Sequence, residues 1–432
     1  MVIARVNIWE HFVGAVMWDE VTEVSNFEFD VSFVKTTLDL SPIRMPLEEL
    51  QKGNRIFSFP GLSKQSYHGL PGLLADSLPD KFGNELIDAW LARQGRTPES
   101  MNPVERLCYI GKRGMGALEF EPSTTGPGDT STTVEIDELV KLAKQAIDGK
   151  KNLATGMNQK DGLMDIIRVG TSAGGARAKA VIAYNDKTKE VRSGQLNVPR
   201  GFAHWLIKLD GVTNDKLGDP KGYGRIEYAY YKMALACGIE MMESKLMEEH
   251  GRTHFMARRF DRPHGNEKLH MQTLCGLAHY DYNQSTTYSY EQAFQVMRDL
   301  RLEHNDAEQL YRRMIFNVIA RNHDDHTKNI SFLMNKNGNW KLAPAYDVTY
   351  AFDPTNMWLA QHQLSINGKR KDITQKDILA IAKEISVKKG KAIINEVADI
   401  IRKWPEFAME AGIPKKQMNS ITKVHLTKVN SV

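Results

Sequence analysis

The chain has 432 residues, enough for two or three domains, and its 41% hydrophobic and 25% charged residues are ordinary for a globular protein. Its net charge of +4 is too small to indicate nucleic-acid binding by itself. The three cysteines are far apart and form no CxxC pair, which argues against disulfides and structural zinc and favours a reducing compartment. No signal peptide and no run of 18 apolar residues is found, so we expect a cytoplasmic protein without a membrane span.

The N-terminal quarter predicts strands followed by a helix and a linker. The first 60 residues alternate apolar and polar residues, most clearly in FEFDVSFV at 27–34, which predicts half-buried strands. Residues 79–95 predict a helix with a proline near its start and a glycine near its end. The glycine-rich GKRGMGA at 111–117 leads into a strand, and we interpret it as structural. Residues 121–133 are almost all turn formers and predict a linker.

The rest of the chain divides into a strand-rich part and a helical part. After a predicted helix at 134–149, strands are expected to return with one helix among them, at 164–169, 179–185, 204–210 and 253–261, with the helix at 225–238. From about 287 the pattern is nearly all helical. The exception is ISFLM-NKNGN-WKLAP at 330–344, where two apolar runs around Asn-Gly predict a β-hairpin.

The segment NHDDHTKN at 322–329 carries the most specific chemistry. Asp324 and Asn329 have the D-x-x-x-x-N spacing of a protein-kinase catalytic loop, where the aspartate orients the attacking hydroxyl and the asparagine holds Mg²⁺. The hairpin that follows would return Asp347 to the same metal ion. Phosphoryl transfer needs these oxygen ligands and a carboxylate near the nucleophile, so the segment predicts an ATP- and Mg²⁺-dependent phosphotransferase.

Two residues upstream fit the same chemistry. Lys208 ends an alternating strand, where a lysine can neutralise nucleotide phosphates or simply lie at the surface. Glu227 opens the following helix, where it can pair with that lysine or only complement the helix dipole. The small-residue loop GTSAGGARAKA at 170–180 would let backbone N–H groups approach phosphates, although it matches neither a Walker A loop nor GxGxxG.

The HDDH run at 323–326 has an alternative interpretation as a metal cluster of the HD-type phosphohydrolases. Such a site needs further histidines, and no second HD-like cluster occurs among the 13 histidines of the chain. We therefore expect His326 and Lys328 to line a nucleotide cleft instead.

Together these features predict an α+β, bilobed protein-kinase-like fold with ATP in the cleft between the lobes. The N-terminal lobe would be mixed α/β and the C-terminal lobe mostly helical. We expect three domains, namely an N-terminal α/β subdomain at 1–125, a nucleotide-binding N-lobe core at 134–262, and a helical C-terminal lobe with the catalytic loop at 263–432.

At this level of detail the chain resembles the HipA family of serine/threonine kinases, the toxins of bacterial HipBA toxin–antitoxin modules. The resemblance covers most of the chain and rests on the joint order of six segments, which are TSAGGARAKA, HWLIKLD, EYAYYKMALACGI, ARRFDR, NHDDHTKN and APAYDVTYAFDP.

The resemblance implies a role for each matching residue. Asp324 would be the catalytic aspartate, Asn329 and Asp347 the Mg²⁺ ligands, and Ser172 the site of autophosphorylation. Asp325 replaces a glycine of a well-known member and would add a negative charge beside the catalytic base, Asp324. The residues expected to contact ATP are Gly174, Gly175, Ala176, Arg177, Ala178, Lys179, Lys208, Phe260, His326, Lys328 and Tyr346.

The resemblance also implies partners. These are a small helix-turn-helix antitoxin of the HipB type, operator DNA reached through that antitoxin, and a protein substrate, which in the family is an aminoacyl-tRNA synthetase. The basic KRK cluster at 369–371 is expected to be exposed, either as a solvated loop or as a contact to operator phosphates. The alternative is a kinase-like corepressor module with little catalysis. A pseudokinase would usually have lost at least one of four residues that are all present here, namely Lys208, Asp324, Asn329 and Asp347.

Overall fold

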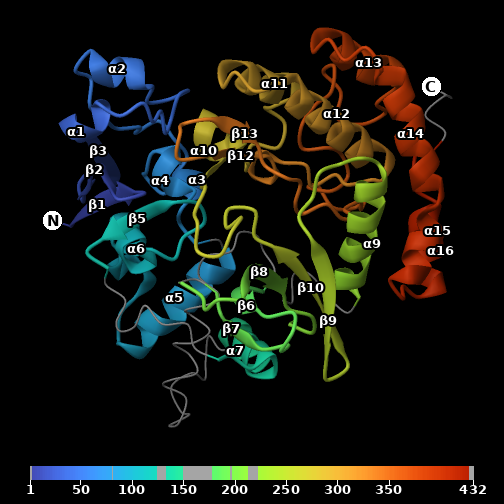
Figure 1. The fold of residues 1–432 in the computed structure, drawn as a ribbon, viewed down its shortest axis with the longest axis horizontal. Helices are drawn as coiled ribbons and strands as arrows, with labels where there is room; N and C mark the ends of the chain where they lie inside the picture. The colour runs from blue at the N-terminus through green and yellow to red at the C-terminus, as the bar shows by residue number, and fades with distance from the viewer. Residues whose placement is uncertain are drawn as a thin grey trace.

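The computed structural model describes residues 2–79, 81–123, 133–148, 178–194, 197–212 and 222–427. These residues form a mixed α/β fold with three antiparallel sheets, and helices gather toward the C-terminal end (Figure 1). In Figure 1 the N-terminal sheet lies at the left, the second sheet at the bottom centre, and a column of C-terminal helices at the right.

The N-terminal sheet has the strand order β4-β3-β2-β1-β5. The strand predicted at 27–34 is right only in its first half, because β3 ends at Phe29. The side chain of Asp30 then accepts a hydrogen bond from the Ser32 N–H over 2.8 Å and caps a helical turn. The strands are β1 (Ile3–Ile8), β2 (His11–Asp19), β3 (Val24–Phe29), β4 (Ile56–Phe57) and β5 (Leu118–Glu121), and the helices are α1 (Val31–Val34), α2 (Leu47–Gln51), α3 (Lys64–Tyr67), α4 (Gly72–Ala75), α5 (Lys81–Arg93), η1 (Pro98–Ser100) and α6 (Pro103–Ile110).

The second sheet has the order β7-β6-β8-β10-β9 and is antiparallel at every pairing. Its hydrophobic core also takes in residues from helix α5, so this N-terminal helix packs with the second sheet. The domain boundaries expected from the sequence stay predictions. The elements here are α7 (Ile136–Asp148), β6 (Lys179–Tyr184), β7 (Val191–Ser193), β8 (Ala203–Lys208), α9 (Tyr223–Ala236), β9 (Ser244–Glu249) and β10 (Arg252–Arg258).

The third sheet contains the hairpin that the sequence predicted. β12 (Ser331–Met334) and β13 (Trp340–Leu342) pair in antiparallel fashion across the Asn-Gly turn, where Gly338 has a φ of +80°. A third strand, β11 (His270–Thr273), pairs with β12 and was not expected from the sequence.

The C-terminal helices share one large hydrophobic core with α9 and with apolar residues of the hairpin. Among the described helices, none combines the length and the apolar character that crossing a membrane requires. The helices are α10 (Leu274–Ala278), α11 (Tyr290–Asp299), α12 (His304–Ile319), η2 (Thr327–Asn329), α13 (Gln375–Glu384), α14 (Gly390–Arg402), α15 (Trp404–Glu410) and α16 (Lys415–Thr422).

The N-terminal part touches the C-terminal part where α4 meets α10. A Cβ atom on Gly72 would lie only 2.0 Å from the carbonyl oxygen of Gly276, so glycine is needed for this close approach. The carboxylate of Asp76 accepts hydrogen bonds from the N–H and the hydroxyl of Thr273, over 2.7 and 2.8 Å, and Thr273 in turn caps α10. Helix α10 in turn contacts η2, which lies in the NHDDHTKN segment.

Candidate active site

The loop that carries Asp324 follows α12 and is closed by one short hydrogen bond. Nδ2 of Asn329 donates to the carbonyl oxygen of Asp324 over 2.7 Å. The side chain of Asp324 is 50% exposed, and one of its oxygens lies 3.7 Å from Nε2 of His326. The loop therefore presents a carboxylate to solvent while its backbone is held.

The hairpin β12–β13 leads the chain back to this loop. The N–H of Ala345 donates to the carbonyl oxygen of Glu240 over 2.8 Å and anchors the segment just before Asp347. Asp347 itself has a φ of +51°, in the left-handed region that residues other than glycine seldom adopt. Such backbone strain often accompanies functional sites.

Lys208, at the end of β8, lies between two carboxylates. Its Nζ is 2.5 Å from Oε1 of Glu227 on α9, and it also donates to Oδ1 of Asp347. Burial alone would lower the pKa of Lys208, but the charges of Asp347 and Glu227 outweigh burial and raise it. Burial likewise opposes ionisation of Asp347, yet Lys208 holds the pKa of Asp347 below its usual range. Lys208 therefore stays protonated between the two carboxylates.

A second lysine lies beside the first. Lys179 is the register partner of Lys208 in the antiparallel pairing of β6 with β8, and it is only 4% exposed. Its charge contributes to lowering the pKa of Asp347, after the effects of burial and Lys208. Two lysines on neighbouring strands thus face the carboxylate that the sequence predicted as a metal ligand.

Aromatic side chains form another side of the site. The ring centres of Phe260 and Tyr346 are 5.5 Å apart. The hydroxyl of Tyr346 donates to the carbonyl oxygen of Lys328 and contacts the hydroxyl of Ser331. Nζ of Lys328 lies 4.4 Å from the centre of the Tyr282 ring. Aromatic rings at such a position can pack against the flat face of a base.

Four of the residues predicted from the sequence line one pocket, namely Asp324, Asn329, Tyr346 and Asp347. The same pocket is lined by Tyr290, Arg313 and Asn317, which the sequence analysis missed. They lie on α11 and α12, whose residues the sequence marked only as helical, and no local pattern singles them out.

The predicted phosphate loop is only partly placed. Ser172 and the residues from Gly174 to Arg177 lie outside the described residues. Ala178 is buried, and its carbonyl oxygen accepts from the N–H of Leu209 over 3.0 Å in the core of the second sheet.

Asp325 follows Asp324 and lines the same pocket, but its carboxylate is bound by interior groups. Its carboxylate is 2% exposed and is occupied by hydrogen bonds from Tyr290 and from the Gln363 N–H, with Nδ1 of His362 also 2.8 Å away. Its charge is therefore directed into the protein interior.

The HDDH run does not assemble as a metal cluster. Within the described residues, the one group of at least three possible ligands lies elsewhere, at Asp137, Glu249 and His250. His323 instead places Nδ1 2.9 Å from the carbonyl oxygen of Leu359, and burial lowers its pKa to about 3. The buried imidazole is thus part of the packing behind the loop.

The KRK cluster is exposed at Lys369 and Lys371, as expected from the sequence, whereas Arg370 is only partly exposed. Nζ of Lys369 is 2.8 Å from a carboxylate oxygen of Asp377. Arg370 is only partly exposed and donates to the carbonyl oxygens of Gln363 and Tyr288, so it braces the loop from within. Two of the three cations are therefore engaged in internal contacts.

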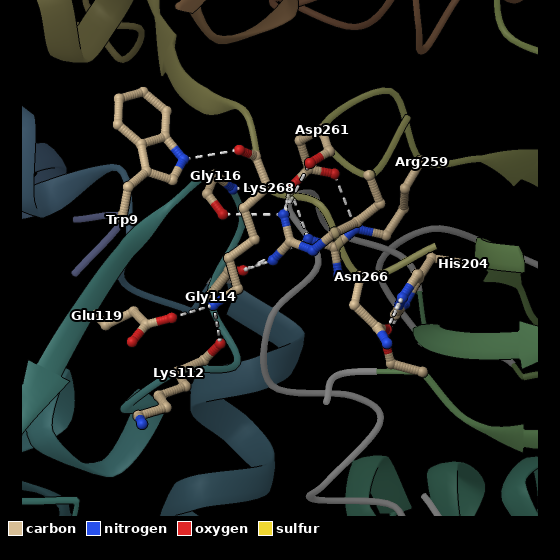
Figure 2. Close-up of polar contacts among 12 residues, drawn as sticks. Trp9, Lys112, Gly114, Gly116, Glu119, His204, Arg259, Asp261, Asn266 and Lys268 are labelled. Atoms are coloured by element: carbon tan, nitrogen blue, oxygen red, sulfur yellow. Dashed lines mark hydrogen bonds and ion pairs between the residues drawn. The ribbon is translucent and has the colours of Figure 1, made fainter. Parts of the chain in front are cut away.

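A buried ionic cluster is formed by residues that flank Phe260 in the chain. Asp261 accepts from Arg259 over 2.7 Å (Figure 2). It also accepts from Arg262 over 2.7 Å, and all three side chains are at most 3% exposed. The N–H of Gly116 also donates to Asp261 over 2.7 Å, while its carbonyl oxygen accepts from Arg262 over 2.9 Å. The glycine-rich loop at 111–117 therefore has the structural role that we expected, because it joins the N-terminal part to this segment.

Comparison with known protein families places the chain. A model described as the HipA-like C-terminal domain matches residues 171–425, and one described as the HipA N-terminal domain matches residues 4–121. The chain belongs to the HipA family. The resemblance inferred from the sequence is thereby confirmed.

Three individual proteins also match the chain, two of them as solved structures. A Haemophilus influenzae protein named "Putative kinase" is 28% identical over 135 residues, which cover 28% of this chain and 39% of that relative's length. HipA of Shewanella oneidensis MR-1, solved with HipB and operator DNA, shares the fold with a TM-score of 0.67 and 16% identity, over 99% of this chain and 98% of that one. A Helicobacter pylori proinflammatory kinase, CtkA, matches with a TM-score of only 0.35 and 16% identity over 60% of this chain and 91% of that one, too weak to inform the fold.

Proposed function

We propose that this chain is an ATP-dependent serine/threonine protein kinase of the HipA toxin type. In this proposal the fold is bilobed, with the second sheet forming the nucleotide lobe and the C-terminal helices the other lobe. The observation that carries the proposal is the contact of Lys208 with both Glu227 and Asp347, next to the pocket that Asp324 and Asn329 line.

The residues present fit ATP and Mg²⁺. Asp347 and Asn329 offer the carboxylate and amide oxygens that Mg²⁺ prefers, and Lys208 and Lys179 offer positive charge to phosphates. Bound Mg²⁺ would neutralise charge on the transferring phosphoryl group. Phe260, packed on Tyr346, would border the base.

Asp324 is the group that acts on the acceptor. Its carboxylate is half exposed, so the hydroxyl of a protein serine or threonine can approach it from solvent. The carboxylate would accept the hydroxyl proton and orient the oxygen, which is the role of the aspartate in this spacing. His326, 3.7 Å away, would border the same cleft.

The proposal is tested by incubating the purified chain with labelled ATP, with and without Mg²⁺. We expect Mg²⁺-dependent transfer of label to the chain itself and to an added protein substrate. Binding of ATP without any transfer would favour the alternative, a kinase-like corepressor module.

Lys208→Ala is expected to weaken ATP binding by about 10- to 100-fold, because a hydrogen bond to a charged group contributes about 1.5–3 kcal/mol. Isothermal calorimetry in the presence of Mg²⁺ measures the change. Lys245→Ala is a matched control, since Lys245 lies in the same sheet and pairs with the exposed Asp186. Equal ATP affinity in Lys208→Ala and wild type would reduce Lys208 to a structural residue.

Autophosphorylation is expected at Ser172, within the loop predicted to bind phosphates. A phosphate there adds roughly −1.5 to −2 charge at pH 7 and would repel the phosphates of ATP. Mass spectrometry after incubation with ATP should find phosphate on Ser172, and the modified protein should bind ATP weakly. Phosphate found on Thr171 alone, or normal ATP affinity of the Ser172 phosphoprotein, would refute this self-regulation.

The proposed partners follow from the family. The Shewanella structure is a complex of HipA with HipB and operator DNA. We propose that a HipB-type helix-turn-helix antitoxin binds this chain and brings it to operator DNA, so that contact with DNA is indirect. The proposed substrate is a protein, with an aminoacyl-tRNA synthetase as the first one to test.

A further inference from the structure

Asp324 and Asp325 are neighbours in the chain but have opposite environments. Asp325 accepts from the hydroxyl of Tyr290 over 3.0 Å and from the N–H of Gln363 over 2.8 Å, and it lies 2.8 Å from Nδ1 of His362. The side chains of Asp325 and His362 are each 2% exposed, whereas that of Asp324 is 50% exposed. One carboxylate is an internal anchor, and the next faces solvent.

The anchor connects back to the loop on the other side of Asp324. The hydroxyl of Tyr290, on α11, also accepts from Nδ2 of Asn317 over 3.0 Å. Oδ1 of Asn317, on α12, in turn accepts from Nδ2 of Asn322 over 3.0 Å. The loop is therefore held both two residues before Asp324 and one residue after it.

The backbone of the loop is also tied to the segment that follows Asp347. The N–H of His323 donates to the carbonyl oxygen of Ala351 over 3.0 Å, and the N–H of Ala351 donates to Arg321 over 3.1 Å. The ring centres of His323 and His362 are 4.2 Å apart. The contacts of Asp325 thus belong to a network that includes both flanks of the catalytic loop.

We propose that Asp325 is a positioning residue that, with Tyr290 and His362, fixes the catalytic loop so that the Asp324 carboxylate points at the acceptor hydroxyl. This inference rests on the proposed kinase function. A misplacement of about 1 Å can lower the rate of an enzyme by about 100-fold. Because the proposed metal ligand Asn329 belongs to the same loop, the relevant affinity is that of ATP without Mg²⁺. This affinity is expected to depend on Lys208, so loss of the network should lower kcat and leave it unaltered.

The test compares Asp325→Ala, Asp325→Asn and Tyr290→Phe in the full chain. We expect kcat to fall by about 100-fold in Asp325→Ala, with the calorimetric affinity for ATP, measured without Mg²⁺, at the wild-type value. Asp325→Asn should restore much of the rate, because its amide oxygen still accepts from the Gln363 N–H. Tyr290→Phe removes one hydroxyl only, so it should fold and show a smaller fall in kcat.

Asp377→Ala is the matched control. Asp377 is also a buried carboxylate, 3% exposed, and it accepts hydrogen bonds from Thr374, Asn367 and Lys369. Among the described residues these hydrogen bonds involve none of the residues 322–329. The control should lose stability without a selective loss of kcat, which separates positioning from general destabilisation.

Amide hydrogen exchange distinguishes failure of this inference from failure of the proposed function. Peptides covering residues 320–330 should exchange faster in Asp325→Ala than in Asp377→Ala, whether or not the wild-type chain transfers phosphate. Unchanged exchange in this loop, or an unchanged kcat in Asp325→Ala and Tyr290→Phe, would overturn the positioning role. Faster exchange in a chain without kinase activity would support the anchoring of the loop and refute the kinase proposal alone.

Discussion

Asp324→Ala is expected to lower phosphoryl transfer by about 100- to 10,000-fold, the usual contribution of a general base. The substitution should cost little stability, because the Asp324 side chain is half exposed and its neighbour His326 is 3.7 Å away. ATP affinity should stay near the wild-type value, since the proposed phosphate contacts come from other residues. Single-turnover transfer from labelled ATP and calorimetry measure the two quantities.

Asp347→Ala, in the same pocket, is expected to affect ATP binding as well as phosphoryl transfer. It removes a proposed metal ligand that also pairs with Lys208, so both transfer and the Mg²⁺ dependence of ATP binding should be lost. Asp186→Ala, at an exposed aspartate paired with Lys245, should leave both unchanged. Transfer at the wild-type rate in Asp324→Ala would rule out the proposed mechanism.

The site residues that we predicted from the sequence belong to recognisable local sequence patterns. The D-x-x-x-x-N spacing identifies Asp324 and Asn329, and the Asn-Gly turn between apolar runs predicts the hairpin that leads to Asp347. The alternating strand and the helix after it suggested that Lys208 and Glu227 would meet, and their side chains lie 2.5 Å apart. Each of these inferences depends on one local stretch of the chain; Lys208 and Glu227, for example, are 19 residues apart.

The errors arise where partners are distant in sequence. The inward hydrogen bonds of Asp325 were not foreseen, because its partners Tyr290 and His362 are 35 and 37 residues away and carry no motif of their own. Strand β11 escaped notice because a four-residue run becomes a strand only through pairing with β12. Arg370 looked like a surface cation in a basic cluster, yet it braces two backbone carbonyls.

The buried cluster around Asp261 is expected to have the largest effect on stability. Asp261→Ala should lower the free energy of unfolding by about 3–5 kcal/mol, because two arginines would stay buried without their counter-charge. Burial already lowers the pKa of Arg262 to about 10 even with the Asp261 charge beside it. The change is measured as a shift in the urea unfolding transition, followed by tryptophan fluorescence.

One of the seven tryptophans, Trp9, lies at this contact between the N-terminal part and the rest of the chain, where its Nε1 donates to the carbonyl oxygen of Lys268 over 2.8 Å (Figure 2). Asp399→Ala is the control, since its ion pair with Arg402 is exposed on both sides and should contribute at most about 1 kcal/mol. Asp261→Asn keeps the shape of the side chain but not its charge, so most of the loss should persist if electrostatics dominate. An unfolding transition in Asp261→Ala that matches Asp399→Ala would show that the arginines find other partners.

Because Phe260 lies between Arg259 and Asp261 in the chain and packs on Tyr346, the same variant should also weaken ATP binding if this cluster holds the proposed base site in place.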